Sequence, residues 1–247
     1  GVMTHDITDE VHPEVAEMAT LAARVVGLDI AGIDLVATDI SQPLQAQGGG
    51  IVEVNAGPGL LMHVKPAVGR PRPVGEAIVE HLFGPRDDGR IPVVGITGVA
   101  DTTPIALLVG WLLHRSGLGT GVSCTEGLYL QMQRIDASQP SDWEAGQRIL
   151  MNRCVDAAVL ENSPRSLLDD GLSYDRCHVG VVTGVPEPHG LEDHHILTQE
   201  QMRTVLRTQV DVVLPNGCAV LNADDEVCAG LAELCDVSFV VLVQRLE

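Results

Sequence analysis

The stretch 91–104, which reads IPVVGITGVADTTP, holds the residue types and spacing most suggestive of chemistry. It predicts a buried strand, a tight loop and the start of a helix, where a mononucleotide-binding fold places its phosphate loop. A working loop follows the pattern G-x-x-x-x-G-K-[ST], in which glycines let backbone N–H groups approach the phosphates and lysine neutralises them. The candidate nucleotide contacts are Gly95, Gly98 and Thr103. However, Asp101 replaces the second glycine and Thr102 replaces the lysine, so we predict the architecture of a nucleotide site without its main cation.

A second set of polar residues lies on two predicted strands of the first part of the chain. Asp34 lies in one strand, and Glu53 and Asn55 lie two residues apart in the next. Side chains at i and i+2 of a strand point to the same face. Two carboxylates and an amide oxygen on one face make a hard-oxygen site of the kind that Mg²⁺ prefers. The alternative is that Asp34 and Glu53 are exposed edge carboxylates without a ligand.

The composition limits the classes of protein to which the chain can belong. Its 247 residues are 45% hydrophobic but only 2% aromatic, which is typical of α/β proteins whose parallel strands are buried on both faces. The formal net charge of −19 would repel phosphate backbones, so we expect neither nucleic-acid binding nor attachment to anionic membranes. Simple solubility is the plainest explanation of this acidity.

The six cysteines contain no C-x-x-C pair, so zinc-site spacing is absent from the sequence. No apolar run is long enough to span a bilayer, and no signal peptide is recognisable. We therefore expect reduced thiols and a cytoplasmic location.

The candidate residues lie in two regions of the chain, and a polar linker at 84–90 separates these regions. Before the linker, the pattern predicts helices at 9–26 and 73–83 and strands at 28–37 and 51–55. After it, strands are predicted at 91–97, 119–124, 156–160, 178–183, 218–221 and 237–243. Helices are predicted at 103–116, 142–152, 199–210 and 224–235. This alternation favours a parallel sheet covered by helices on both faces. Both ends read as interrupted elements, so we expect a piece of a longer protein.

Several motifs occur in an order that resembles the cyanophycin synthetase family. They are GLDIAGID at 27–34, EVNAGPG at 53–59, DEVHP at 9–13, Met62-His63, DAAVLE at 156–161, YDRC at 174–177 and AVLNADD at 219–225. The resemblance covers nearly the whole chain. It implies the C-terminal part of an ATP-grasp domain at 1–88, followed by a truncated Mur-ligase-like domain with a degenerate phosphate loop at 89–247.

The resemblance also implies an activity, ligands and partners. Members of the family use ATP and Mg²⁺ to build a polymer with an Asp backbone and Arg side chains. By resemblance, Asp34, Glu53 and Asn55 are the magnesium ligands of the ATP-grasp part. Leu61 replaces an arginine of the family, and His63 and Lys65 are candidates to compensate. The expected partners are Asp, Arg or an Asp-Arg dipeptide, a cyanophycin-like polymer and further copies of the chain.

In the Mur-like part, the resemblance makes Glu161 and His189 candidate metal ligands beside Thr103. Residual polar groups of a former cleft are the alternative. Several neighbouring family residues are replaced here, by Asp169, Gly184 and Pro188 among others. We therefore predict an amide ligase whose active site lies in the ATP-grasp part and whose Mur-like part is catalytically inactive; no catalytic side chain is assigned. The alternative is a non-catalytic scaffold or polymer-binding protein, and a third possibility is a ligase specialised for preformed Asp-Arg dipeptides.

Overall fold

The computed structural model describes residues 3–85, 87–138, 142–235 and 237–242. Its contacts divide the chain into two compact units, Gly1–Gly89 and Arg90–Glu247. The sequence places the corresponding boundary between residues 88 and 89. Within the described residues, no helix is long and apolar enough to cross a bilayer.

The first helix of the first unit, α1 (Pro13–Val26), has a capping residue at each end. Its N-cap is His12, whose Nδ1 accepts a hydrogen bond from the backbone N–H of Glu14 at 3.2 Å. Its C-cap is Gly27, which has a left-handed φ of 87°. The helix begins later than the predicted 9–26, because a proline disfavours helical geometry in the residue before it. A short 3₁₀ turn, η1 (Thr8–Glu10), occupies the predicted first turn instead.

The helix α1 contacts an antiparallel ribbon of β1 (Gly32–Val36) and β2 (Gly50–Asn55). Val15 of α1 and Leu44 of the 3₁₀ turn η2 (Leu44–Gln47) are each only 1% exposed. Two further helices, α2 (Leu61–Val64) and α3 (Val74–Leu82), follow the ribbon. Arg72 ties the start of the unit to the segment before α3, since its guanidinium lies 2.8 Å from Asp6 and 2.7 Å from Asp9.

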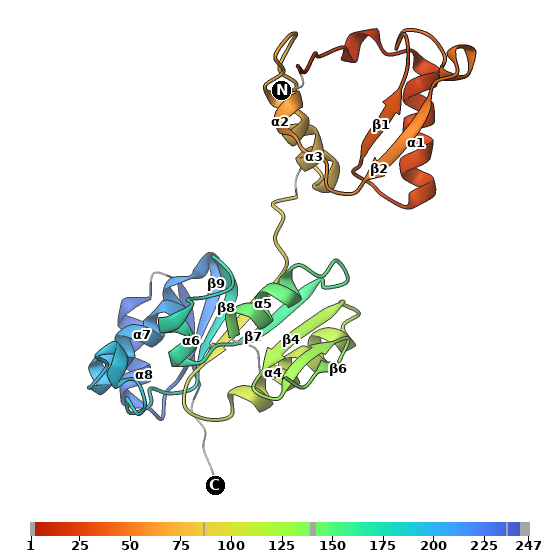
Figure 1. The fold of residues 1–247 in the computed structure, drawn as a ribbon. Helices are drawn as coiled ribbons and strands as arrows, with labels where there is room; N and C mark the ends of the chain where they lie inside the picture. The colour runs from red at the N-terminus through yellow and green to blue at the C-terminus, as the bar shows by residue number, and fades with distance from the viewer. Residues whose placement is uncertain (1–2, 86, 139–141, 236, 243–247) are drawn as a thin grey trace. The chain divides into compact units, whose positions relative to one another are not determined.

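The second unit is built on an eight-stranded sheet with the order β10-β9-β8-β3-β7-β4-β5-β6. Strands β10 through β4 in that order run parallel, and β5 and β6 form an antiparallel hairpin at one edge. The strands are β3 (Val93–Thr97), β4 (Thr120–Cys124), β5 (Gly127–Leu130), β6 (Gln133–Asp136), β7 (Ala157–Glu161), β8 (Cys177–Val182), β9 (Val213–Asn222) and β10 (Ser238–Leu242). The predicted parallel α/β architecture is confirmed (Figure 1).

Helices cover both faces of this sheet. On one face, α4 (Thr102–Arg115) places Ala106 against Ile96 and Val159. The other face carries α5 (Asp142–Leu150), α6 (Pro164–Asp169) and α7 (Gln199–Asp211). Alternate residues of the central strands face α4 and the opposite helices, so both faces are apolar, as a doubly covered parallel sheet requires.

Three features of the second unit differ from the sequence prediction. The hairpin β5–β6 was not predicted; its turn residues Gln131 and Met132 have φ values of 51° and 64°. Two-residue hairpin turns of this kind usually contain Asn-Gly or Gly-Gly, and this turn contains neither dipeptide. The predicted helix at 224–235 is divided into α8 (Glu226–Ala229) and the 3₁₀ helix η4 (Gly230–Leu234). The helix α6 was also missed, because its six residues are too few to show a helical period.

Candidate functional site

The ribbon of the first unit brings the three predicted magnesium ligands onto one face. In its register, Asp34 lies directly opposite Glu53, and Asn55 follows two residues later on the same strand. Asn55 Nδ2 donates a 3.4 Å hydrogen bond to Asp34 Oδ2. Since directly opposed residues share a face and i, i+2 residues do too, both carboxylates and the amide project to the same side. Their role as metal ligands stays a prediction.

A pocket of about 900 Å³ lies beside this face. It is lined by Asp34 and Asn55 from the ribbon, Gly57 and Gly59 from the following turn, and His63 from α2. His81 of α3 also lines it, although sequence reasoning missed this residue. Leu61 stands at the position where the resemblance predicts an arginine. Its side chain is 71% exposed, so it is not part of a buried core. The pocket therefore brings the side chains of Asp34 and Asn55 together with two imidazoles within one unit, and Glu53 is not among the residues that line it.

Two residues of the predicted phosphate loop in the second unit have positive φ angles. Gly98 has a φ of 141°, and Asp101, the N-cap of α4, has a left-handed φ of 59°. Asp101 thus adopts the geometry for which a glycine is suited, and Asp is one of the few residues that tolerate it. Its side chain makes no capping hydrogen bond and is exposed. The predicted loop therefore carries an exposed carboxylate at a position with left-handed backbone geometry.

The hydroxyl groups that begin α4 are directed to a carboxylate at the end of β7. Thr102 Oγ1 lies 2.6 Å from Glu161 Oε1, and Thr103 Oγ1 lies 3.1 Å from Oε1 and 2.9 Å from Oε2. Thr125, after β4, adds a hydrogen bond of 2.7 Å from its backbone N–H and one of 3.2 Å from its hydroxyl. Glu161 therefore accepts hydrogen bonds from three threonines, two of them at the start of α4.

Two other predicted residues of this region lie apart from that cluster. His189 is exposed, and its recorded contact is a backbone hydrogen bond to Glu187. Among the described residues, no group of three or more His, Cys, Asp or Glu side chains is arranged to hold a metal ion. Gly95 lies in β3, where an added Cβ would collide with Tyr174 and Gln209. The nucleotide contacts predicted for Gly95, Gly98 and Thr103 stay predictions. In the structure, Gly95 allows Tyr174 and Gln209 to pack closely against β3.

A buried polar network beside Gly95 of β3 was not foreseen from the sequence. Asn162 Nδ2 donates to Tyr174 Oη at 3.0 Å and to Gln209 Oε1 at 3.1 Å. Tyr174 Oη donates to the same Gln209 oxygen at 2.9 Å, and burial raises the pKa of Tyr174 above its usual range. Gln209 Nε2 lies 3.6 Å from Cys177 Sγ, whose pKa burial raises to about 12. The YDRC motif contributes both Tyr174 and Cys177, but its partners come from distant elements.

The chain is similar to known synthetases over almost its entire length. It is 40% identical over 234 residues to cyanophycin synthetase of Synechocystis sp. and 39% identical over 229 residues to that of Nostoc sp.. These alignments cover 94% and 92% of this chain but only 27% and 25% of the relatives. The chain thus spans about a quarter of the length of the relatives it matches. No protein-family model matches it.

The fold is also similar to a solved ligase. The structure of UDP-N-acetylmuramoyl-L-alanyl-D-glutamate–2,6-diaminopimelate ligase superposes with a TM-score of 0.51. The match covers 64% of this chain and 33% of that one at 16% identity. At this identity the likeness concerns the fold alone, and it supports the predicted α/β architecture with a mostly parallel sheet.

Proposed function

We propose that this chain is part of an ATP-dependent amide ligase, because it is a homologue of cyanophycin synthetases over 92–94% of its length. We assign the active site to the first unit, as the C-terminal part of an ATP-grasp domain, and we assign the second unit as catalytically silent. The proposed substrates are Asp, Arg or an Asp-Arg dipeptide and the growing peptide polymer.

The proposed reaction has two balanced steps. A substrate carboxylate attacks the terminal phosphorus of ATP, which forms an acyl phosphate and releases ADP. The amine of the second substrate then attacks the acyl carbon, which forms the amide and releases phosphate, and the amine loses its proton. Magnesium ions bound at such a site neutralise phosphate charge and orient the transferred group.

The oxygen ligands of the first unit fit a magnesium site by chemistry and placement. Asp34 and Glu53 supply carboxylates and Asn55 supplies an amide oxygen, all from one face of the ribbon. Hard oxygens of this kind suit Mg²⁺, which is commonly held by one or two carboxylates together with phosphates. His63, which lines the adjoining pocket, is our candidate for contacting a substrate anion where the family arginine is absent.

A single observation supports our proposal that the second unit is catalytically inactive: the threonines at the start of α4 donate their hydroxyl groups to Glu161. Phosphoryl transfer requires cations and N–H donors around developing negative charge. Here Thr102, in place of the lysine, donates its hydroxyl to Glu161, and Asp101 adds an exposed negative charge. Loss of one stabilising donor raises a barrier by about 3–4 kcal/mol, so these two changes together support the proposed absence of turnover.

The test is ADP release by the complete protein that carries this chain. It is measured with Mg²⁺ and a peptide-polymer primer while Asp, Arg or the Asp-Arg dipeptide is supplied separately. We expect release with Asp or the dipeptide and none with Arg alone. Release that depends on Arg alone would show that the second unit turns over ATP. No release under any condition would favour a non-catalytic scaffold, for which the exposed Leu61 in place of an arginine is the present argument.

A further inference from the structure

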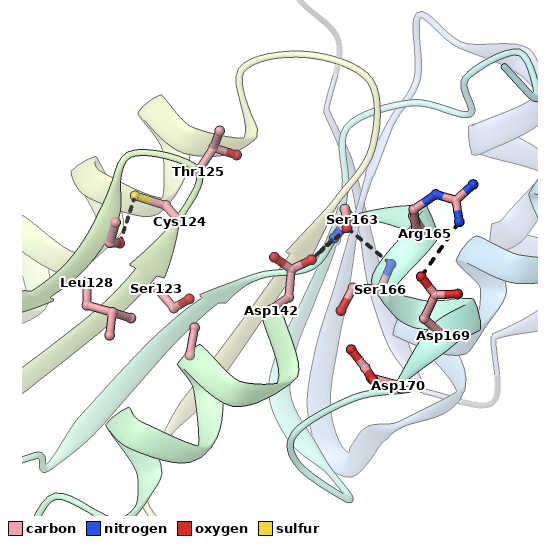
Figure 2. Close-up of a pocket in the computed structure, with 12 residues that line it drawn as sticks. Ser123, Cys124, Thr125, Leu128, Asp142, Ser163, Arg165, Ser166, Asp169 and Asp170 are labelled. Atoms are coloured by element: carbon pink, nitrogen blue, oxygen red, sulfur yellow. Dashed lines mark hydrogen bonds and ion pairs between the residues drawn. The ribbon is translucent and has the colours of Figure 1, made fainter. Parts of the chain in front are cut away.

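The helices of this chain cover the two faces of the large sheet to different extents. On one face, α5, α6 and α7 pack on the strands. Figure 2 shows part of this face, where Asp142 at the start of α5 accepts hydrogen bonds of 2.6 and 2.7 Å from Ser163, the N-cap of α6. On the other face, α4 contacts β3, β7 and β4. Strands β8 and β9 instead pack on α7 and α8, which belong to the first face.

The direction of the crossovers explains this difference. Each of α5, α6, α7 and α8 lies in a connection that steps from the β6 edge of the sheet towards the β10 edge. The connection from β3 to β4, which contains α4, steps the opposite way. Because crossovers between parallel strands are right-handed, connections that step in opposite directions place their helices on opposite faces. Of the described α-helices of this unit, α4 is therefore the one on its face.

The alternating residues of β8, β9 and β10 reveal an uncovered apolar surface on the α4 side of the sheet. Val182, Ala219 and Leu221 point towards α7 and are at most 1% exposed. Successive residues of a strand point to opposite faces, so the alternate residues point away from α7. These residues form a surface that we call the open face: Val179 of β8, Cys218 and Val220 of β9, and Val240 of β10. None of the four is buried, although a parallel sheet is normally covered on both faces.

The helix α4 is apolar on its outer side as well as on the side that packs on the sheet. Ala106 and Gly110 are buried, whereas Leu108, Trp111 and Leu112 are 57%, 48% and 53% exposed. Their spacing of three and four residues places these three side chains on one stripe of the helix. A helix that is apolar all round is typical of a buried position. The outer stripe of α4 is therefore a second uncovered surface on the same side of the sheet.

We propose that the open face and the outer stripe of α4 are covered by a helical segment of the same polypeptide that lies outside residues 1–247. Helices are the elements that cover parallel sheets in α/β proteins. The alignments cover only 25–27% of the synthetase relatives, so about three quarters of a polypeptide of that length remains to supply the segment. A second copy of this chain is the less favourable occupant, because two chains that each carry a net charge of −19 repel one another.

The test is thiol labelling with N-ethylmaleimide, quantified for each cysteine peptide by mass spectrometry, in this chain and in the complete protein that carries it. Val240→Cys reports on the open face. Phe239→Cys is the matched control, because Phe239 is paired with Ala219 on the opposite face and is 48% exposed, as Val240 is. The exposed Cys154 is the internal standard.

We expect labelling of Val240→Cys, relative to Cys154, to be at least about tenfold slower in the complete protein than in this chain, because a covered side chain reacts only after local opening. Labelling of Phe239→Cys should change by less than about twofold, since its face already carries α7 and α8. Equal protection of the two positions, or no protection of Val240→Cys, would overturn the proposal. Leu112→Cys tests the outer stripe in the same way, and its full reactivity in the complete protein would overturn the assignment of that stripe.

Protein concentration distinguishes the two possible occupants of this surface. A segment of the same polypeptide protects Val240→Cys at every concentration, whereas protection by a second copy decreases on roughly hundredfold dilution by mass action. Protection that is lost on dilution, or that this chain shows alone at high concentration, would identify a second copy and overturn the assignment to the same polypeptide. Labelling requires no turnover, so its outcome is independent of ADP release, which tests the proposed ligase.

Discussion

The hydroxyl of Thr102 donates a 2.6 Å hydrogen bond to Glu161, which links the first residue of α4 to the last residue of β7. In a working phosphate loop, the position of Thr102 carries the lysine that neutralises the phosphates. The side chain at this position instead stabilises a carboxylate within the protein. At the position where the loop pattern predicts a lysine, the structure therefore has a neutral donor bonded to Glu161.

Restoring both missing residues of the loop should restore nucleotide binding to the second unit. The double variant Asp101→Gly with Thr102→Lys removes an exposed carboxylate and returns the cation. Glycine also accepts the φ of 59° that residue 101 already has. We expect ATP to shift the backbone amide NMR signals of Gly98 and Thr103 in this variant but not in the unmodified chain. Those two signals distinguish the loop from any site in the first unit.

The matched control for that experiment is Thr102→Val, which breaks the bond to Glu161 without adding charge. It should leave the Gly98 signal unaffected by ATP. If the unmodified chain already shows the shifts at the same ATP concentration, then the second unit binds nucleotide despite Asp101 and Thr102.

Replacement of Gly95 by alanine should destabilise the second unit by about 3 kcal/mol. The new Cβ would collide with Tyr174 Oη and the amide of Gln209, and overpacking of a closed core typically costs 1–3 kcal/mol. Movement of either group would also disturb their hydrogen bonds to Asn162. The measurement is urea unfolding followed by tryptophan fluorescence, since Trp111 and Trp143 both lie in this unit.

The control for Gly95→Ala is Gly230→Ala in the same unit. An added Cβ at Gly230 meets no atom within 4 Å, and its φ is −62°. We expect its effect to lie within about 0.5 kcal/mol, as for a surface substitution. Equal effects of the two substitutions would show that the network of Asn162, Tyr174 and Gln209 does not constrain β3.

Much of this fold could be predicted from local patterns, and the failures have physical reasons. The two-residue period placed Glu53 and Asn55 on one face, and the register of β1 with β2 agrees. The turn at Gln131 and Met132 escaped prediction because tertiary packing holds residues with positive φ that carry no turn signal. Sequence reasoning grouped Glu161 with Thr103 and His189; Thr103 does donate a hydrogen bond to Glu161, but the donors Thr102 and Thr125 were not foreseen. Such contacts join segments far apart in the chain, and no local period encodes them.

The ion pair between Arg90 and Asp175 should contribute to stability in mild acid. Hydrogen bonds of 2.9 and 2.6 Å from Arg90 lower the pKa of Asp175 to about 2. A carboxyl whose folded pKa lies below its unfolded value of about 3.9 stabilises the fold above that value. The contribution is lost as pH falls from about 4 towards 2. Because the pair is largely solvent-exposed, we expect only about 0.5–1 kcal/mol.

The measurement for this pair is the thermal midpoint of the second unit, followed by tryptophan fluorescence from neutral pH down to about pH 2. Asp175→Asn should lower the midpoint at neutral pH and reduce its further decrease in acid. Glu187→Gln is the charge-matched control and should leave the slope in acid unchanged. An unchanged slope for Asp175→Asn would mean that solvent screens the pair completely.

A pair of isosteric substitutions should separate the two units functionally in the complete protein. Glu53→Gln removes a proposed magnesium ligand and should lower the rate of ADP release by roughly 100-fold, since loss of one stabilising group at a phosphoryl site has about that effect. It should also raise the Mg²⁺ concentration needed for half-maximal rate. Glu161→Gln removes the charge from the threonine cluster and should change the rate by less than about twofold.

Each variant of this pair is the control for the other, because both convert a glutamate at or near the end of a strand to glutamine. The expected ranking follows from the contacts. The carboxylate of Glu161 accepts hydrogen bonds from Thr102, Thr103 and Thr125, whereas Glu53 lies directly opposite Asp34 in the ribbon of the first unit. If Glu161→Gln abolished ADP release while Glu53→Gln had no effect, the assignment of the active and silent units would be reversed.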